Sequence, residues 1–337
     1  MSGAGSISVV VPTHQRRERV LAMLKAFSRQ TFPATRFEVV VSIDGSTDGT
    51  REALEAVTTV HALRVLWHTR RGRAAALNAG VDASSGELTV LLDDDMEPAP
   101  EFLDAHWRAH SDRTRRGVMG AVPIHVDPGA PPAVRYIAAK FNGHLARLAR
   151  PEHTLQLTDF YSGNFSIRRE VLRDVGGFDE DFRLYGHEDL EWSFRLSGAG
   201  VVLAYDGGAL ARQHTDKGFL ALAEDSVAEG RTAVLFALKH PDAFPQLKLG
   251  TFSRGPRVLR FVRNQLLRLG RHGPAIPDWV IRLEAGLARV DPPGMTSFYR
   301  LALGYLYWIG ARQAIDEARR AARPIGPLAG LAKDLRL

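Results

Sequence analysis

Residues 89–96 have the sequence Thr89-Val90-Leu91-Leu92-Asp93-Asp94-Asp95-Met96, an apolar run that ends in three consecutive carboxylates. The apolar part is typical of a buried strand, and Pro98 and Pro100 prevent regular structure from following at once. Neighbouring carboxylates repel one another unless a cation lies among them. The stretch therefore predicts either a divalent metal site at the end of a strand or a solvated acidic turn.

The chain before this run alternates between short apolar segments and segments with helical character. We predict strands at 7–11, 37–43, 63–68 and 87–92, and helices at 17–30, 51–57 and 74–81. The strands lack polar alternation, so both of their faces are expected to be covered. This pattern predicts an α/β fold in which crossover helices flank a sheet that is parallel in this part.

The remainder of the chain changes character twice. Residues 116–210 mix short strands with a Pro-rich loop at 123–132, and the chain beyond about residue 221 is predicted to form helices separated by Pro and Gly. We therefore expect an α/β domain at 6–218, followed by a helical C-terminal region at 219–337.

The composition excludes several classes of protein. No cysteine is present, which excludes a disulfide framework and thiolate metal sites and fits a reducing, cytoplasmic setting. No stretch approaches the roughly 20 consecutive apolar residues of a membrane span. Residues 1–6 lead into a strand rather than into the apolar segment of a secretory signal. The abundance of Ala and Arg is associated with bacterial chains from GC-rich genomes.

Two further polar segments follow predicted strands, at 12–16 and 44–50. Ligands of parallel α/β sheets bind at the carboxyl ends of strands, so these segments and 93–95 are expected to converge on one crevice. There Asp44 can accept a hydrogen bond from a nucleobase N–H group, while Thr13 supplies backbone contacts. The alternative for residues 44–49 is a plain turn that caps the next helix.

Four motifs in this order carry a resemblance to a known family. They are VVVPTHQR at 9–16, VVVSIDGSTDGT at 39–50, RRGRAAALNAG at 70–80 and LLDDDMEP at 91–98. Together they resemble the nucleotide-binding half of inverting glycosyltransferases of family two, which have the GT-A fold, over roughly residues 7–215. The implied fold is a mixed, Rossmann-like sheet flanked by helices.

The resemblance implies a role for individual residues. Asp44 would bind the nucleobase and Arg73 would lie near the phosphates, although one of Arg70, Arg71 and Arg73 suffices for that contact. Asp93 and Asp95 would form the DXD element, with Asp95 on the metal and Asp93 closer to the ribose. The donor-binding set implied in this way is Pro12, Thr13, Asp44, Arg73, Asp93, Asp94, Gly163 and Asn164.

The segments GGFDEDF at 176–182 and GHEDLEWSFRL at 186–196 resemble the acceptor side of such enzymes. They look most like the galactosyltransferase and chondroitin-polymerase type, in which a Glu-Asp pair follows two glycines. Here His187 replaces the second glycine. By the resemblance Asp189 is the general base and Glu188 positions a sugar. The alternative is that both are ordinary acidic residues at a helix N-terminus.

The resemblance also implies a metal ligand, because related families place a histidine just beyond a strand such as 201–204. His214 occupies that position. Two oxygen donors and an imidazole suit Mn²⁺ better than Ca²⁺, and we expect Mn²⁺ or Mg²⁺.

The implied function is transfer of a hexosyl or N-acetylhexosaminyl group from a nucleotide sugar, expected to be UDP-linked, to a hydroxyl acceptor with inversion. The acceptor would be a glycan, a lipid-linked glycan or a small molecule, as in synthesis of polysaccharide or cell-envelope glycans. The alternatives are nucleotidyl transfer, sugar-nucleotide hydrolysis and a catalytically inactive regulatory protein that binds nucleotide sugars. Nucleotidyl transfer typically needs a Gly-rich phosphate loop, which residues 12–17 lack.

The net charge of +6 is unevenly distributed: from Thr251 onward, 15 Lys and Arg and 6 Asp and Glu give +9, which leaves −3 for the rest. A helix is predicted at 257–269 with an apolar and a basic side. The apolar side would hold Val258, Leu259, Val262, Leu266 and Leu269, and the basic side Arg257, Arg260, Arg263 and Arg268.

This region is either a helical bundle with a solvated basic surface or a surface that rests on anionic lipid and presents a lipid-linked acceptor. The second interpretation would place the protein peripherally on the inner face of the plasma membrane. Nucleic acid is not expected as a partner, because no recognised binding module is present.

Overall fold

The computed structural model describes residues 6–112, 115–254, 256–270 and 276–335. The chain divides into two compact units. The first contains residues up to 125, 140–183 and 189–215, and the second contains residues 126–139, 184–188 and 216 onward. The helical region expected at 219–337 makes up most of the second unit.

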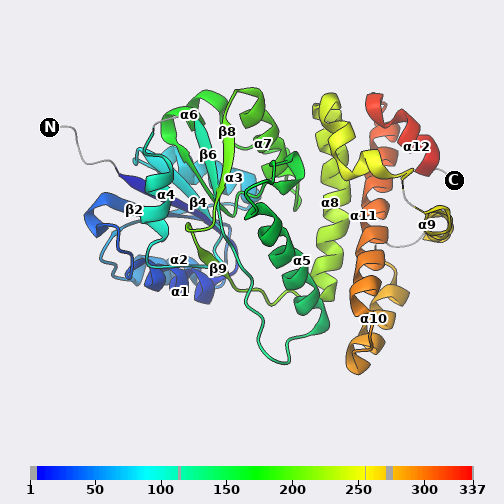
Figure 1. Ribbon diagram of the computed structural model, residues 1–337, viewed down its shortest axis with the longest axis horizontal. Helices are drawn as coiled ribbons and strands as arrows, with labels where there is room; N and C mark the ends of the chain where they lie inside the picture. Colours follow the sequence, from blue (N-terminus) through cyan, green and yellow to red (C-terminus); the bar gives the residue numbers. More distant parts are fainter. Residues whose placement is uncertain (1–5, 113–114, 255, 271–275, 336–337) are drawn as a thin grey trace. The chain divides into compact units, whose positions relative to one another are not determined.

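A seven-stranded sheet with the order β3-β2-β1-β4-β7-β6-β8 forms the centre of the first unit (Figure 1). Its strands are β1 (Ile7–Thr13), β2 (Phe37–Asp44), β3 (Ala62–His68), β4 (Leu88–Leu92), β6 (Arg116–Gly120), β7 (Asn164–Arg168) and β8 (Val202–Asp206). β7 is antiparallel to both of its neighbours, and the other pairs are parallel. The short strands β5 (Met96–Pro98) and β9 (Ala211–Gln213) form a separate antiparallel pair.

Both faces of the sheet are covered, because alternate residues of its buried strands point in opposite directions. Val9 and Val11 of β1 pack with one hydrophobic cluster, whereas Val10 packs with another. The first cluster includes residues of α1 (Arg17–Phe27), α2 (Thr50–Ala56) and α4 (Phe102–Ala109). The second includes residues of α3 (Arg73–Ala83), α6 (Arg169–Val175) and α7 (Glu188–Gly198).

The expected α/β fold with a mixed sheet and a helical C-terminal region is confirmed, and the predicted strands and helices of the first third are present with small shifts at their ends. Helices α4, α5 (Pro132–Leu148) and α6 were not predicted. Helix α5 follows directly on the loop expected at 123–132, because Pro132 is the first residue of the helix rather than the last of the loop. Its first residues belong to the second unit and its last to the first unit.

The second unit is built around α8 (Phe219–Lys239) and α11 (Met295–Arg320), which run side by side (Figure 1). Glycines allow their backbones to approach closely. A Cβ atom on Gly230 would lie 1.9 Å from the carbonyl oxygen of Tyr307, and one on Gly310 would lie 2.0 Å from that of Val227. The remaining helices of this unit are α9 (Arg257–Leu269), α10 (Asp278–Val290) and α12 (Ala329–Leu335).

Short 3₁₀ turns complete the two units, at Ala34–Arg36, Leu157–Asp159, Pro241–Gln246, Lys248–Thr251 and Gly326–Leu328. Across the described residues, no helix has both the length and the apolar character needed to cross a membrane.

Candidate active site

The carboxyl ends of β1, β2 and β4 lie at one edge of the sheet, because these strands are parallel neighbours. Pro12 and Thr13 end β1, Asp44 ends β2, and β4 leads directly into Asp93. β7 runs the opposite way and begins opposite the end of β4, so the segment 163–164 reaches the same edge. The structure thus brings the predicted donor-side residues to one edge of the first unit.

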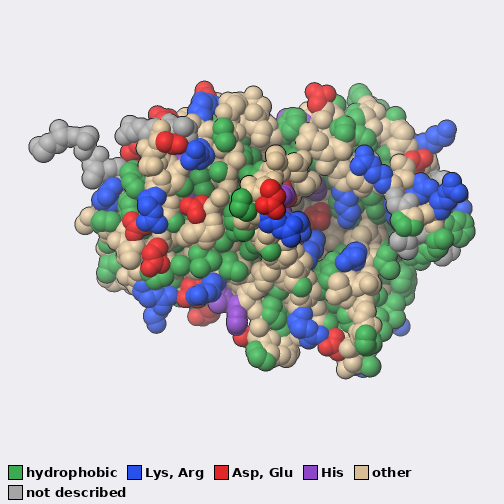
Figure 2. Space-filling model, in the orientation of Figure 1, with side chains coloured by type: hydrophobic (Ala, Val, Ile, Leu, Met, Phe, Trp, Pro, Cys, Tyr) green, Lys and Arg blue, Asp and Glu red, His purple; other side chains and the backbone are tan. Residues whose placement is uncertain are grey.

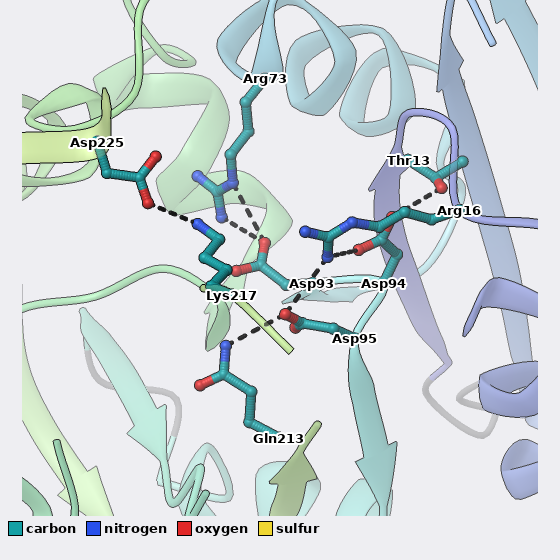
Figure 3. Close-up of polar contacts among 9 residues, drawn as sticks. All are labelled: Thr13, Arg16, Arg73, Asp93, Asp94, Asp95, Gln213, Lys217 and Asp225. Atoms are coloured by element: carbon teal, nitrogen blue, oxygen red, sulfur yellow. Dashed lines mark hydrogen bonds and ion pairs between the residues drawn. The ribbon is translucent and has the colours of Figure 1, made fainter. Parts of the chain in front are cut away.

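The first two carboxylates of the acidic run have different partners (Figure 3). Asp93 Oδ1 accepts a hydrogen bond from Arg73 Nη2 at 2.7 Å, and Arg73 also donates to Ser162 Oγ at 3.1 Å. Asp94 is buried and accepts a hydrogen bond from the hydroxyl of Thr13 at 2.7 Å. Arg73 and Asp93, both predicted site residues, are therefore direct partners.

Sequence reasoning missed two residues that contact this cluster. Arg16 Nη1 lies 2.9 Å from Asp94 Oδ1 and 3.4 Å from Asp95 Oδ2 (Figure 3). Gln213, at the end of β9, donates to Asp95 Oδ2 at 3.3 Å. Arg16 is the last residue of the predicted polar segment 12–16 and Gln213 directly precedes His214, so closeness in sequence to predicted site residues was the available signal.

Burial disfavours the ionised form of two carboxylates in the cluster. It raises the pKa of Asp94 to about 6, although Arg16 and Thr13 act in the opposite direction. Burial also raises the pKa of Asp95, and the nearby charge of Asp93 adds to this effect. The pKa of Arg16 is raised because its two carboxylate partners outweigh the effect of burial, which alone would lower it. An additional cation would therefore stabilise these carboxylates.

Asp44 organises the loop that precedes α3. One of its carboxylate oxygens accepts a hydrogen bond from the backbone N–H of Arg71 at 2.7 Å, and the other accepts one from Gly72 at 2.9 Å. Its carbonyl oxygen accepts a hydrogen bond from the ring of His14 at 2.7 Å. Oδ1 also lies 3.4 Å from His68 Nδ1, whereas Oδ2 keeps a second lone pair, which is what a nucleobase N–H group would need.

Gly163 allows β7 to approach the acidic run. Its carbonyl oxygen accepts a hydrogen bond from the backbone N–H of Asp93 at 3.0 Å. A Cβ atom at position 163 would lie only 2.4 Å from Asp93 Oδ2, so any side chain there would displace that carboxylate.

Asn164 is fully buried, and its side chain is used inside the unit. Its amide donates to the carbonyl oxygens of Ala209 at 2.9 Å and Ala121 at 3.2 Å. Its Oδ1 accepts a hydrogen bond from His106 Nε2 at 2.9 Å. These contacts hold the start of β7 in place, and a direct role of Asn164 in donor binding stays a prediction.

The predicted acceptor-side pair begins α7. Glu188 is the first residue of the helix and is buried, and Asp189 is the second and is half-buried. Glu188 belongs to the segment 184–188 of the second unit, whereas Asp189 belongs to the first. Placement at a helix N-terminus stabilises the ionised form of both carboxylates.

His187 keeps the backbone conformation that a glycine would have. Its φ is 68°, in the left-handed region, directly after Gly186 with a φ of 93°. Histidine tolerates this region better than most residues. The ring contacts Thr232 Oγ1 at 3.0 Å, and burial lowers the pKa of His187 to about 4. The departure from the two-glycine pattern therefore changes a side chain rather than the path of the backbone.

The acidic cluster suits a divalent cation, although the predicted ligands are only partly assembled. Asp95 Oδ1 is buried and has no hydrogen-bond partner, so it offers one oxygen ligand. The backbone N–H of His214 donates to the carbonyl oxygen of Asp95 at 2.9 Å, but its ring donates to Glu97 at 3.1 Å. Within the described part of the chain, no three acidic, His or Cys side chains are arranged to hold a metal. Mg²⁺ commonly takes few protein ligands and completes its shell with substrate phosphates, so this arrangement fits a cation that binds with a diphosphate.

The family profile described as "Glycosyl transferase family 2" matches residues 8–176, half of the chain. The chain belongs to this family. Its enzyme class is therefore that of a glycosyltransferase. The family-two match contains all of the predicted donor-side residues and ends before Glu188, Asp189 and His214.

Named relatives share about a quarter of their residues with this chain. Glycosyltransferase AglE of Haloferax volcanii is 28% identical over 201 residues, which are 59% of this chain and 64% of AglE. Validoxylamine A glucosyltransferase of Streptomyces hygroscopicus subsp. jinggangensis is 27% identical over 291 residues, 76% of this chain and 67% of that protein. The chain thus spans about two thirds of the length of these relatives.

Solved structures share the fold. The mannosyltransferase PcManGT from Pyrobaculum calidifontis, solved with GDP-Man and Mn²⁺, has a TM-score of 0.58 and 19% identity, covering 94% of this chain and 88% of that one. Residues 1–349 of TarS from S. aureus, solved with UDP, have a TM-score of 0.51 and 17% identity, covering 94% and 92%. These likenesses confirm the expected GT-A fold.

Proposed function

We propose that this chain is a metal-dependent glycosyltransferase that transfers a sugar from a nucleotide-sugar donor to a hydroxyl acceptor with inversion. The observation that carries the proposal is the partnerless, buried Oδ1 of Asp95, in a cluster of three carboxylates at the sheet edge where Thr13 and Asp44 end their strands. A carboxylate oxygen is costly to bury without a partner, and a metal-bound diphosphate would supply one.

Three side chains would orient the donor. Asp44 would accept a hydrogen bond from the base, and Asp93 would lie close to the ribose. Arg73 pairs with Asp93 in the structure, and its guanidinium would turn to the diphosphate as the donor arrives. Arg suits this role because its planar donors match phosphate oxygens.

Mn²⁺ or Mg²⁺ would be held by Asp95 and, once its ring leaves Glu97, by His214. When bound, the cation would neutralise the negative charge that develops on the departing nucleoside diphosphate. The mannosyltransferase PcManGT was solved with Mn²⁺, which supports a divalent cation here by likeness of fold.

Asp189 would act on the acceptor. As the acceptor oxygen forms its bond to the anomeric carbon, the bond from that carbon to the diphosphate oxygen breaks, and Asp189 takes the acceptor proton. Attack from the face opposite the leaving group gives inversion, and no covalent intermediate with the enzyme is needed. Glu188 would position the sugar or the acceptor.

The donor nucleotide and the setting of the reaction are also proposals. We expect a UDP-sugar; among the fold relatives, one was solved with GDP-Man and another with UDP. The basic C-terminal part supports a peripheral position on anionic lipid, at the inner face of the plasma membrane, where a lipid-linked acceptor would be met.

A panel of UDP- and GDP-sugars, assayed for hydrolysis and thermal stabilisation with Mn²⁺, Mg²⁺ or excess EDTA, tests the proposal. We expect turnover of at least one donor that requires the metal and that Asp95→Ala abolishes while the protein stays folded. Equal turnover in excess EDTA would contradict metal dependence. Metal-dependent binding without any turnover, even with acceptors supplied, would instead indicate a nucleotide-sugar-binding protein.

Asp189→Asn tests the proposed base. The amide keeps the shape of the carboxylate but cannot take a proton, so turnover should fall by roughly 100-fold or more. Donor affinity, measured by titration calorimetry, should stay within about twofold. Asp82→Asn, the same change at an exposed position near the end of α3, is the matched control and should leave turnover unchanged. A large loss of donor affinity with normal turnover at saturation would show that the role is misassigned.

A further inference from the structure

Helix α9 turns apolar side chains away from its own unit. The exposed fractions are 72% for Val258, 62% for Phe261 and 46% for Val262. These residues are spaced by three and four positions, so they form one stripe along the helix. Helices of globular proteins normally turn such a stripe towards the core.

Arginines occupy the inner side of α9 instead. Arg263 lies 3.8 Å from the centre of the Phe252 ring and donates to the Phe252 carbonyl oxygen at 2.6 Å. Arg260 donates to the carbonyl oxygen of Ser253. This differs from the expectation that both would lie on a solvated basic face, because each guanidinium has partners within the unit.

The C-terminal end of α9 is also fixed in its orientation. Leu267 is buried, and the guanidinium of Arg312, from α11, donates to the carbonyl oxygens of Leu267 and Gly270. The hydroxyl of Tyr305 donates to the carbonyl oxygen of Leu266 at 3.2 Å. A cation at a helix C-terminus is favourable, so the helix is held with its apolar stripe outward.

Helix α10 repeats the arrangement. Trp279, Leu283 and Val290 are exposed by 50%, 46% and 77% and lie along one side of the helix. Its inner side carries the buried Val280 and Glu284, whose carboxylate accepts a hydrogen bond from the Tyr299 hydroxyl at 2.7 Å.

Exposed arginines border both stripes. They are Arg257 and Arg268 on α9 and Arg282 and Arg289 on α10. Figure 2 shows basic and hydrophobic side chains next to one another over α9, and the α9 sequence contains no acidic residue. In both helices the arginines lie to the same side of the apolar stripe, as the 100° step per residue requires.

We propose that α9 and α10 form a docking surface for an anionic lipid bilayer, with Val258, Phe261, Val262, Trp279, Leu283 and Val290 entering the interface and the four arginines bound to headgroups. Two stripes of this kind, each flanked by cations, match the composition of helices that lie in the plane of a membrane. A tryptophan at the stripe fits the headgroup region. Charge favours this occupant, because the described residues of α9 and α10 include four exposed arginines against one exposed carboxylate, Asp278, and this net positive charge complements anionic lipid.

This inference rests on the peripheral membrane position proposed above and names the surface responsible. It does not depend on the proposed chemistry, because none of its residues belongs to the acidic cluster. Vesicle binding and donor turnover can therefore fail separately.

Fluorescence quenching by brominated lipid tests insertion directly. The full-length protein is mixed with vesicles of phosphatidylcholine and phosphatidylglycerol that carry bromine on the acyl chains. We expect quenching that Trp279→Phe removes and Trp67→Phe retains, since Trp67 is a comparably exposed tryptophan of the first unit. Quenching that is unchanged in Trp279→Phe would overturn the proposed insertion.

Variants of the stripe and of its border give the second readout. We expect the double substitution Phe261→Ser and Val262→Ser to weaken binding to these vesicles at least tenfold, because less apolar surface enters the bilayer. We expect replacement of four arginines by glutamine to weaken binding roughly 100-fold at low salt, and these are Arg257, Arg268, Arg282 and Arg289. Gln at four exposed arginines of the first unit, Arg108, Arg147, Arg150 and Arg173, removes the same charge and should have little effect.

Circular dichroism and thermal unfolding establish that each variant is folded. Equal losses in the two sets of arginine variants would show that net charge alone binds the vesicles and would overturn the surface. Wild-type binding that does not distinguish anionic from neutral vesicles would overturn it as well. So would a dimer in solution that the stripe variants dissociate, because the second copy would then be the occupant.

Discussion

The guanidinium of Arg16 contacts two carboxylates of the acidic run, Asp94 and Asp95. Arg16 lies three residues after the end of β1. Burial disfavours the ionised forms of Asp94 and Asp95. The positive charge of the Arg16 guanidinium reduces the repulsion between these two carboxylates. A divalent cation at Asp95 would be close to this guanidinium and would meet its repulsion. Arg16 is therefore expected both to stabilise the metal-free protein and to oppose metal binding in the absence of a diphosphate.

Arg16→Gln separates these two effects. Without metal, the melting temperature should fall, because the two carboxylates lose their cation. With Mn²⁺ alone, the variant should gain more in melting temperature than wild type does, because the metal no longer meets a positive charge. Arg17→Gln is the control, since the side chain of Arg17 is exposed and pairs with Glu18. A gain from Mn²⁺ no larger than that of wild type would contradict this account.

The sequence predicts the residues that end strands better than it predicts their partners. Thr13, Asp44 and Asp93 follow apolar runs, so their place at the sheet edge follows from strand periodicity. The contact of Arg16 with Asp94 joins residues 78 positions apart, and no periodicity within either segment indicates it. The ring of His214 illustrates the same limit, because its contact with Glu97 depends on how β9 pairs with β5.

Helix α4 and strand β7 are joined by a buried chain of hydrogen bonds that requires neutral histidines. Asn164 donates through its amide and so accepts from His106 Nε2, which leaves His106 Nδ1 to accept from Ser166. His110 Nε2 then donates to Ser166 at 2.9 Å. Burial lowers the pKa of His106 to about 4 and that of His110 to about 3.

This network predicts a loss of stability in mild acid. An unfolded histidine titrates near pH 6.5, so between that pH and about 4 the unfolded chain binds protons that the folded one does not. The stabilisation is complete above pH 6.5 and is lost as pH falls, by up to about 1.4 kcal/mol per pH unit for each histidine. Urea unfolding at pH 7.5, 6.0 and 5.0 measures this slope.

Variants assign the slope to these two histidines. His106→Gln with His110→Gln should lower stability at pH 7.5 but flatten its pH dependence, because two of the groups that take up protons on unfolding are gone. His125→Gln, at an exposed position, should leave the slope as it is in wild type. A double variant as steep as wild type would assign the acid loss to other groups.

Elements were predictable where local pattern and tertiary environment agree. Apolar strands such as 37–43 and 87–92 are buried on both sides, so their composition reports their position. The direction of β7 was not predictable, because the pattern of Asn164–Arg168 is the same for a parallel and an antiparallel neighbour. The outward face of α9 was also missed, since periodicity locates a stripe but not the side of the helix that packs.

On the scale of the whole molecule, the two units carry different proposed tasks, and hydrogen exchange can separate them. A metal and nucleotide diphosphate should protect backbone amides at the strand ends of the first unit, around 12–16, 44–48, 70–73 and 93–96. Anionic vesicles should protect α9 and α10 instead, since buried amides exchange more slowly. Mass spectrometry of peptides from each condition measures both. Vesicle protection confined to the first unit would contradict the division of tasks.

The place of β7 in the sheet has a consequence for how the chain folds during synthesis. β3, β2, β1 and β4 are neighbours in the sheet and can pair as soon as residue 92 has left the ribosome. β6 has only β7 and β8 as neighbours, both of which come later in the chain. At typical rates of translation, synthesis of the roughly 50 residues between β6 and the end of β7 takes roughly 2–10 s. Only then can β7 pair with both β6 and β4 and so connect β6 to the strands made earlier. During that interval the apolar residues of β6 have no strand to pair with, and this is the stage at which a nascent chain would need the protection of a chaperone.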